Sequence, residues 1–256
     1  MKTIYVCGDS IEGIFSAVYD AWRTKKTEEE CGIALRGFLE QELFCEYVEV
    51  TERKEKMLAV EKLICKYLGL QAYHDIYYAL LADDAGKGDA VLGTMLEAKK
   101  IRDSRRIMEH LGHPKVAKVF ELSRKVENEA HLLTEFIRFR ELENGVLYAP
   151  VTPKAQVLTC IAPHFADRFP LENWMIHDKT HKMYAVHEAR KQWVLAEGEE
   201  TGGDERFGQV SEKEQEYARL WKSFCDTIAI QERENPVCQR GHLPLRFRPN
   251  MTEFRR

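Results

Sequence analysis

This sequence lacks the features that would assign a protein to a membrane or to the secretory pathway. It has no run of about 18 apolar residues of the kind that spans a membrane. The first residues, Met1 to Asp9, contain too short an apolar stretch for a secretory signal peptide. We therefore expect a cytoplasmic protein that has no membrane among its partners.

Cysteine is present, but its spacing shows no pairing. The cysteines stand singly, as Cys7, Cys31, Cys45, Cys65, Cys160, Cys225 and Cys238. An odd number without a repeated short spacing argues against a disulfide framework and against a cysteine zinc site. We expect most of them to be small, buried and reduced side chains.

The sequence also lacks the motifs that usually identify an enzyme. It has no Gly-x-Ser-x-Gly, no His-Glu-x-x-His, no complete phosphate-binding loop and no clear helix-turn-helix. Gly8-Asp9-Ser10 lies between a predicted strand, residues 4–7, and a predicted helix, residues 10–22. Because the turn lacks the Gly-Lys-Ser/Thr ending of a nucleotide loop, a helix cap at Ser10 is favoured over a phosphate-binding turn.

What the sequence does contain is an uneven distribution of charge behind a net charge of -4. Residues 96–125 carry nine Lys and Arg against four Asp and Glu, and residues 233–256 carry six Arg against two Glu. Residues 196–216 carry two basic against eight acidic side chains. Two basic segments around an acidic one favour a polyanion-binding surface and a solvated loop. Ordinary solvated helix surface is the alternative for the first segment.

Hydrophobic periodicity predicts an α+β fold, a largely helical body with a small antiparallel sheet. Residues 46–50 alternate like a strand that could pair with the first one, and residues 52–135 follow helical spacing. Asn144-Gly145 separates alternating residues 136–142 from residues 146–148. This arrangement is a strong hairpin signal.

The second half of the chain is predicted to extend the sheet and then to form one long helix. Helical spacing at 153–165 is followed by strands at 174–177, 183–186 and 192–195 and by an acidic loop at 197–208. Ser211 is predicted to cap a helix that ends near residue 234, and the tail is predicted to be extended. The chain is interpreted as a single domain, residues 1–256, with a helical part (52–135), a hairpin-helix-strand part (136–196) and a C-terminal helix with a basic tail (211–256).

Two arginines alternate with apolar residues on the first hairpin strand. Arg138 and Arg140 lie on one predicted face, and Ile137 and Phe139 lie on the other. Two guanidinium groups in this spacing suit adjacent phosphates, because each offers a planar fork of donors. A pair of surface arginines bridged to neighbouring glutamates is an equally open alternative.

The segment from His164 to Trp174 gathers His, Asp, Arg and aromatic side chains between a predicted helix and a predicted strand. Aromatic rings beside cations are used to recognise single-stranded or flipped bases. On this hypothesis Phe165, Arg168 and Trp174 bind nucleic acid; a core role for the rings is the alternative. If the protein is an enzyme, His164 and Asp167 are the candidate acid–base pair.

A third cluster contains His177, His181 and His187 together with Asp178. Its spacing crosses a predicted turn and matches no metal motif. Exposed turn residues are therefore favoured, and no metal site is assigned.

The basic tail adds another place where an aromatic ring stands between arginines, because Arg246 and Arg248 flank Phe247. Arg233 opens the same basic segment. The predicted nucleic-acid-binding residues are Arg138, Arg140, Phe165, Arg168, Trp174, Arg233, Arg246 and Arg248.

Nearly end to end, the sequence resembles a bacterial family described as DNA repair or DNA metabolism proteins. The resemblance rests on residues 7–15, 19–22, 120–131, 135–139 and 164–174, on Trp221, Phe224, Ile228 and Ile230, and on residues 232–236 and 243–247. Members of that family are usually encoded beside a radical SAM protein, and longer relatives carry a uracil-DNA glycosylase-like domain. The resemblance implies an accessory role in DNA repair or modification, with DNA and a radical SAM protein as partners.

The sequence has neither a Cys-x-x-x-Cys-x-x-Cys cluster nor a glycosylase domain. The resemblance therefore implies that such chemistry comes from a partner, and we expect no cofactor in this chain. The leading hypothesis is a nucleic-acid-binding accessory protein. The alternatives are an enzyme that acts on a base or nucleotide through His164 and Asp167, and a module that only binds other proteins.

Overall fold

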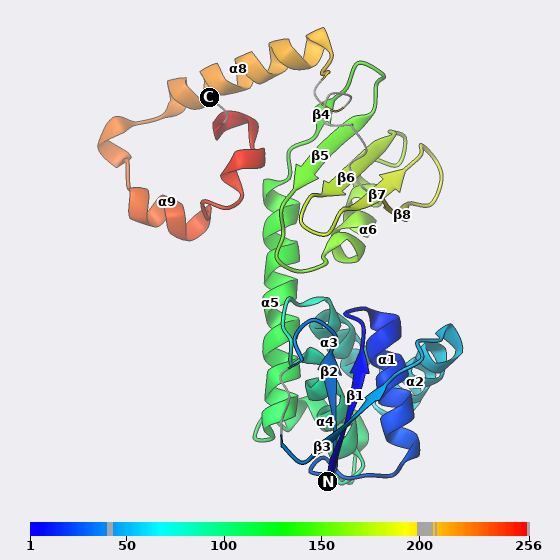
Figure 1. Ribbon diagram of the computed structural model, residues 1–256. Helices are drawn as coiled ribbons and strands as arrows, with labels where there is room; N and C mark the ends of the chain where they lie inside the picture. Colours follow the sequence, from blue (N-terminus) through cyan, green and yellow to red (C-terminus); the bar gives the residue numbers. More distant parts are fainter. Residues whose placement is uncertain (40–42, 199–206, 208, 255–256) are drawn as a thin grey trace. The chain divides into compact units, whose positions relative to one another are not determined.

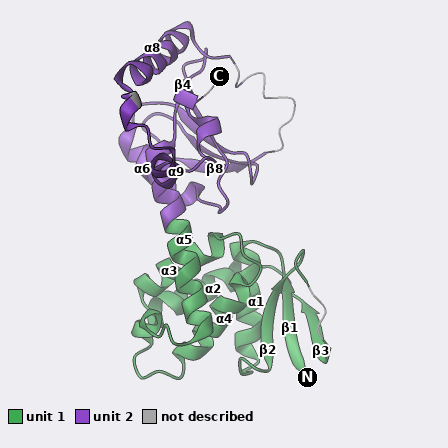
Figure 2. Cartoon of the chain, turned by 90° about the vertical axis from the view of Figure 1, so that its left-hand side faces the viewer, with its two compact units in different colours: residues 1–127 green, residues 128–256 purple. Residues whose placement is uncertain are grey.

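The computed structural model describes residues 1–39, 43–198, 207 and 209–254. They form two compact units, Met1–Glu127 and Asn128–Arg256 (Figure 2). Unit 1 contains β1 (Lys2–Cys7), α1 (Ile11–Arg23), β2 (Cys31–Leu35), β3 (Cys45–Glu49), α2 (Lys54–Tyr67), α3 (Leu70–Leu81), α4 (Lys87–Ala98), η1 (Ser104–Glu109) and most of α5 (Pro114–Phe136).

Unit 2 begins at Asn128, inside the long helix that is labelled α5 in Figure 1. It contains β4 (Arg140–Glu141), β5 (Leu147–Val151), α6 (Leu158–Arg168), β6 (Trp174–Asp178), β7 (Met183–His187), β8 (Val194–Glu197), α8 (Glu212–Ile228), η2 (Gln231–Arg233), α9 (Pro236–His242), η3 (Arg248–Asn250) and η4 (Thr252–Phe254). Helices and strands both contribute to each unit, which confirms the predicted α+β class. No helix in the described ranges has the length and apolar character needed to cross a membrane.

The sheet of unit 1 has the strand order β2-β1-β3, and all three strands are parallel. The predicted strands at 4–7 and 46–50 and their pairing are confirmed. The central strand β1 is buried from Thr3 to Cys7 because α1 packs against it, and the side chains of Ile14 and Phe15 are at most 1% exposed. β2 was not predicted, since its sequence Cys-Gly-Ile-Ala-Leu is short and shows no alternation.

Helix α4 lies against β2 and is buried along almost its whole length. Gly88 permits this close approach, because a Cβ added there would lie 2.9 Å from the Cγ2 atom of Ile33. Most of the core of unit 1 is thus built from helices, as the helical spacing of residues 52–135 predicted.

The sheet of unit 2 has the order β4-β5-β6-β7-β8. The predicted hairpin is confirmed: β4 pairs with β5 in antiparallel register, and Gly145 adopts a φ of 78° in the turn between them. β6, β7 and β8 are also antiparallel neighbours, as predicted, but β5 and β6 are parallel. The expectation of one small antiparallel sheet was therefore wrong, since α6 forms a crossover that joins parallel strands.

The C-terminal part differs from the prediction in its helices. α8 ends at Ile228 rather than near residue 234, and the tail is not extended, because it contains α9, η3 and η4. Pro236 stands in the first turn of α9, where its missing N–H costs nothing, and Asn235 caps that helix by accepting the Cys238 N–H at 3.0 Å. α6 begins at Leu158, later than the helical spacing indicated. Most of the predicted acidic loop lies outside the described residues.

Candidate nucleic-acid interface

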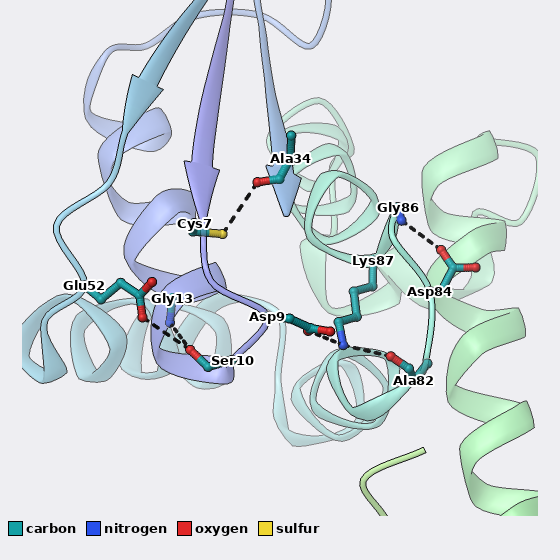
Figure 3. Close-up of polar contacts among 10 residues, drawn as sticks. All are labelled: Cys7, Asp9, Ser10, Gly13, Ala34, Glu52, Ala82, Asp84, Gly86 and Lys87. Atoms are coloured by element: carbon teal, nitrogen blue, oxygen red, sulfur yellow. Dashed lines mark hydrogen bonds and ion pairs between the residues drawn. The ribbon is translucent and has the colours of Figure 1, made fainter. Parts of the chain in front are cut away.

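The turn after β1 is filled by a carboxylate of the protein itself (Figure 3). Ser10 Oγ accepts the Gly13 N–H at 2.9 Å, which confirms the predicted helix cap. Glu52, which follows β3, accepts the Gly8 N–H at 2.8 Å through Oε1, and its Oε2 lies 3.4 Å from the Ser10 hydroxyl. Because Glu52 already supplies negative charge at the start of α1, a bound phosphate is disfavoured there.

Beside this turn, the ammonium group of Lys87 is buried and paired (Figure 3). Its side chain is 2% exposed, its Nζ lies 2.6 Å from Asp9 Oδ1, and it donates to the Ala82 carbonyl at 2.8 Å. A buried charge is tolerated only with such partners. The pair links the turn after β1 to the first turn of α4, and we interpret it as structural.

The Cys7 thiol at the end of β1 is unsuited to act as a nucleophile at neutral pH. Burial, together with the nearby carboxylates of Glu52 and Asp9, raises the pKa of this thiol to about 12. The thiolate is the reactive form of cysteine. The described groups around the turn after β1 thus serve the packing of unit 1.

The aromatic rings predicted to stack on bases lie in the core of unit 2. Phe139 makes edge-to-face contacts with Phe165 at 5.2 Å, Phe169 at 5.6 Å and Trp174 at 6.3 Å between ring centroids. Trp174 is fully buried and stacks on His187, and Phe165 is 5% exposed. Rings enclosed in this way cannot stack on a base, so the structure favours the core interpretation for Phe165 and Trp174.

Two of the predicted arginines hold the C-terminal tail against the rest of unit 2. Arg138 pairs with Glu253 at 2.9 Å, and Arg246 pairs with Glu129 at 2.6 Å. The Arg246 guanidinium also lies 4.7 Å from the ring centroid of Phe247, which is buried. These contacts give both arginines a structural role. The carboxylate that pairs with Arg138 comes from the tail, while the neighbouring Glu135 accepts from Arg138 only through its backbone carbonyl, at 3.0 Å.

The two other arginines predicted in the C-terminal segment, Arg233 and Arg248, lie near α9. Arg248 donates to Gln239 Oε1 at 3.2 Å and to the Leu243 carbonyl at 3.3 Å, and its guanidinium lies 4.8 Å from the Phe254 ring centroid. Arg233 is exposed and lines a separate pocket between the end of α8 and α9. These contacts do not bring either arginine to β4.

His164, Asp167 and Arg168 are exposed on the last turns of α6. His164 and Asp167 are three residues apart and therefore share a face of the helix. A pair that exchanges protons with a bound base has to face a sheltered site, whereas this face is open to solvent. Arg168 forms no ion pair with a described side chain, and its guanidinium is a candidate for phosphate contact.

The histidine cluster is not the exposed turn that was predicted. His177 and Asp178 are fully buried and His187 is 4% exposed, because all three lie within β6 and β7, which each extend one residue beyond the predicted strands. The Tyr148 hydroxyl lies 2.8 Å from His177 Nδ1, and His181 Nδ1 lies 2.6 Å from Asp178 Oδ2. Within the described part of the chain, no three His, Cys, Asp or Glu side chains converge as a metal ion would need.

Three cationic side chains of unit 2 line one groove between β4 and α8, which we call the β4–α8 groove. They are Arg140 on β4 and Arg219 and Lys222 on α8. The groove has a volume of about 440 Å³, and its other described lining residues are Val210, Glu214, Gln215, Ala218 and Thr252. Figure 1 shows α8 beginning close to the hairpin that contains β4.

Hydrogen bonds to β4 fix the start of α8. The Ser211 N–H donates to the Glu141 carbonyl at 3.0 Å, and the Glu141 N–H donates to Glu214 Oε2 at 3.2 Å. Leu142 and Val210 form an antiparallel bridge just before the helix. Ser211 also caps α8 by accepting the Glu214 N–H at 3.1 Å, which confirms the predicted cap.

This attachment places two cations of α8 beside Arg140. Arg219 and Lys222 are three residues apart on α8 and therefore share a face of the helix. Across the groove, the Arg140 guanidinium lies 5.0 Å from the ring centroid of Tyr148, a cation–π contact that helps to orient it. The described lining residues carry these three positive charges and one negative charge, that of Glu214. Guanidinium groups such as those of Arg140 and Arg219 match the oxygens of a phosphate.

Of the predicted binding residues, the structure brings only Arg140 to this groove. Arg219 and Lys222 were not predicted. Their spacing on a predicted helix would have placed them on one face, but the sequence does not show that this face turns toward β4.

The comparisons with known proteins add a family assignment and no activity. The sequence profile of a family described as a domain of unknown function, DUF4130, matches residues 86–253. The matched region begins at the start of α4 and includes the β4–α8 groove, whereas the turn after β1 lies outside it. No curated protein matches the sequence.

Proposed function

The chain belongs to the DUF4130 family, a domain of unknown function, and from this premise we propose that it binds nucleic acid through phosphate contacts in the β4–α8 groove. The resemblance noted in the sequence extends this proposal to an accessory role in DNA repair or modification. The observation that carries the proposal is the convergence of Arg140, Arg219 and Lys222 on one groove. Contacts of this kind recognise the backbone and are strongly salt-dependent.

The proposed mode of binding differs from the one that the sequence alone favoured. Base stacking on Phe165 and Trp174 is not part of it, since both rings are buried. Arg138 and Arg246 are not part of it either, because each is held in an ion pair within unit 2. The exposed Arg168 is a candidate second contact outside the groove.

Fluorescence anisotropy with single-stranded, duplex and uracil-containing DNA at several salt concentrations tests the proposal. We expect salt-sensitive binding that weakens in Arg140→Gln and Arg219→Gln. Each lost phosphate contact lowers the slope of log affinity against log salt by about 0.7–0.9. Arg36→Gln is the matched control, because Arg36 is an exposed arginine of unit 1 that pairs with Glu49.

The same titrations can contradict the proposal that the groove is the interface. If Arg140→Gln and Arg219→Gln stay folded and bind with the affinity and salt slope of the parent, the groove is not the interface. A loss seen only with Arg168→Ala would move the interface to α6.

A second candidate function, docking of a protein partner, is favoured by the exposed face of α8. No residue of this helix is buried. The large apolar side chains Tyr217, Leu220, Trp221, Phe224 and Ile228 are 42–59% exposed. At 100° per residue they lie on the side of the helix opposite Arg219 and Lys222. An exposed row of large apolar side chains is typical of a protein–protein contact, and the resemblance implies a radical SAM protein as the partner.

Co-purification of the full chain with that radical SAM protein tests the docking proposal. We expect Trp221→Glu and Phe224→Glu to abolish the complex, because a charge in the centre of an apolar contact is left desolvated. Leu171→Glu is the control, since Leu171 is a similarly exposed apolar residue of unit 2 outside α8. A complex that tolerates both α8 substitutions would exclude this face as the contact.

A further inference from the structure

The two edges of the sheet in unit 2 differ in how they are covered. At the β4 edge, the segment before α8 adds a further row, because Leu142 and Val210 form an antiparallel bridge and the Glu143 N–H donates to the Gln209 carbonyl at 3.1 Å. At the other edge, β8 pairs with β7 and with no other strand of the described chain (Figure 1). The outer side of β8 is therefore the open edge of this sheet.

Hydrogen bonds show which backbone groups of β8 point outward. The Gly198 N–H donates to the Lys182 carbonyl at 3.3 Å, so these residues form a hydrogen-bonded pair just beyond the two strands. Such pairs alternate along an antiparallel ladder, and the next one joins Ala196 to Tyr184. The N–H and C=O groups of the alternate residues, Leu195 among them, consequently face away from β7. In the described ranges these groups of Leu195 make no hydrogen bond.

The side chains of β8 leave this edge accessible. All four residues of the strand are exposed, and Val194 and Leu195 are 57% and 40% exposed. Edge strands are commonly protected by a lysine, a proline or a covering segment, because their open backbone groups pair readily with another strand. β8 instead begins with three apolar residues and carries its charge at the end, on Glu197. The edge thus has the properties of a strand-pairing surface.

The sequence around β8 fits a second copy of this chain as the pairing strand. When two β8 strands run antiparallel with a two-fold axis at Val194, Lys191 of each copy comes opposite Glu197 of the other. On the same face, Trp193 comes opposite Leu195. Opposite charges and large apolar side chains both stabilise antiparallel strands when they are paired in this way. In this register the outward-pointing residues of the two copies also face one another, as ladder hydrogen bonds require.

We propose that the chain forms a homodimer in which two β8 strands pair in antiparallel orientation about Val194 and join the two sheets into one. A two-fold contact of this kind is closed, since each copy covers the open edge of the other. The strand is short, and contacts of small area are weak. We therefore expect a dimer that dissociates on dilution. The proposal is independent of the nucleic-acid and docking functions proposed above.

Disulfide cross-linking of the full chain tests the register. At the axis, Val194 meets its own copy in a non-hydrogen-bonded pair, whose Cα atoms are about 4.5 Å apart. A disulfide spans that distance, so Val194→Cys should give a covalent dimer under mild oxidation. Ala196→Cys is the matched control, because Ala196 is exposed on the same face of β8 but lies about 13 Å from its own copy in this register. It should cross-link no more than the parent chain, whose own cysteines set the background.

Charge reversal tests the pairs at the two ends of the contact. Glu197→Lys puts like charges opposite each other and should raise the dissociation constant of the dimer by about two- to tenfold. Lys191→Glu combined with Glu197→Lys returns opposite charges and should restore the dimer. Lys191 also pairs with Glu188 of its own turn at 2.7 Å, but both side chains are exposed, and such pairs contribute little. Sedimentation velocity at several protein concentrations measures the dissociation constant.

Three results would overturn the proposal. The first is a chain that stays monomeric at high micromolar concentration, or equal cross-linking of the two cysteine variants. The second is a dimer that Trp221→Glu abolishes and Glu197→Lys leaves intact, which would place the contact at α8. The third is an amide of Leu195 that is protected from hydrogen exchange only when another protein is added, since the pairing strand would then come from that protein. Circular dichroism melting of each variant verifies that the fold is intact.

Discussion

Helices α4 and α8 are both parts of the family-matched region, yet they make opposite use of their apolar residues. Ten of the twelve residues of α4 are buried, whereas none of the seventeen residues of α8 is buried. α4 contacts β2, α1, α3 and η1 in unit 1. α8 is held mainly by its first turn on β4 and by contacts with η4.

The difference shows which helix completes a core and which one remains available for contacts. α4 contributes small residues such as Gly88 and Gly93 that let neighbouring elements approach closely. α8 instead carries aromatic side chains on one face and the groove cations on the other. Loss of a side chain from the core that α4 helps to build should therefore lower the free energy of unfolding far more than loss of a side chain from α8.

The largest difference is expected between two phenylalanines. Phe15→Ala removes a ring of α1 that is 1% exposed, and it should lower the free energy of unfolding by about 3–5 kcal/mol. Phe224→Ala removes a ring of α8 that is 52% exposed, and it should cost less than about 1 kcal/mol. Urea unfolding followed by circular dichroism measures both. A similar cost for the two substitutions would show that α8 is packed into a core in solution.

An intermediate effect is expected at the buried ion pair of unit 1. Asp9→Asn leaves the Lys87 ammonium without its carboxylate in a buried site, which should cost roughly 2–3 kcal/mol. Lys87→Met removes the buried charge and keeps the length of the side chain, so it should change stability by less than about 1.5 kcal/mol. The same urea titrations compare the two. The structural role of the pair is contradicted if Asp9→Asn is neutral.

The smallest effect is expected at the two serine caps. Ser10→Ala should cost about 1 kcal/mol in unfolding, because α1 belongs to the core of unit 1. Ser211→Ala removes an equivalent cap from α8, where the loss should remain local. Amide hydrogen exchange in the first turn of α8 should then increase while the unfolding midpoint stays nearly constant. A large shift of the midpoint in Ser211→Ala would show that α8 unfolds together with the rest of unit 2.

Local signals predicted the elements well where one short stretch decides the structure. The serine caps, the hairpin around Asn144-Gly145 and the strands near Trp174 and Met183 all follow from neighbouring residues. The unpredicted strand β2 and the parallel pairing of β5 with β6 depend on partners distant in the sequence. The prediction of an extended tail missed α9, which begins at Pro236, because proline is well tolerated at the start of a helix.

By itself, the sequence determined the α+β class, most helix and strand positions, and the concentration of arginines in the second half of the chain. Only the tertiary structure decided what those arginines do. Arg138 and Arg246 meet carboxylates of their own unit, whereas Arg140 joins Arg219 and Lys222 in a groove. The physical reason is that periodicity fixes the face of a helix or strand on which a side chain lies, while long-range pairing fixes what that face meets.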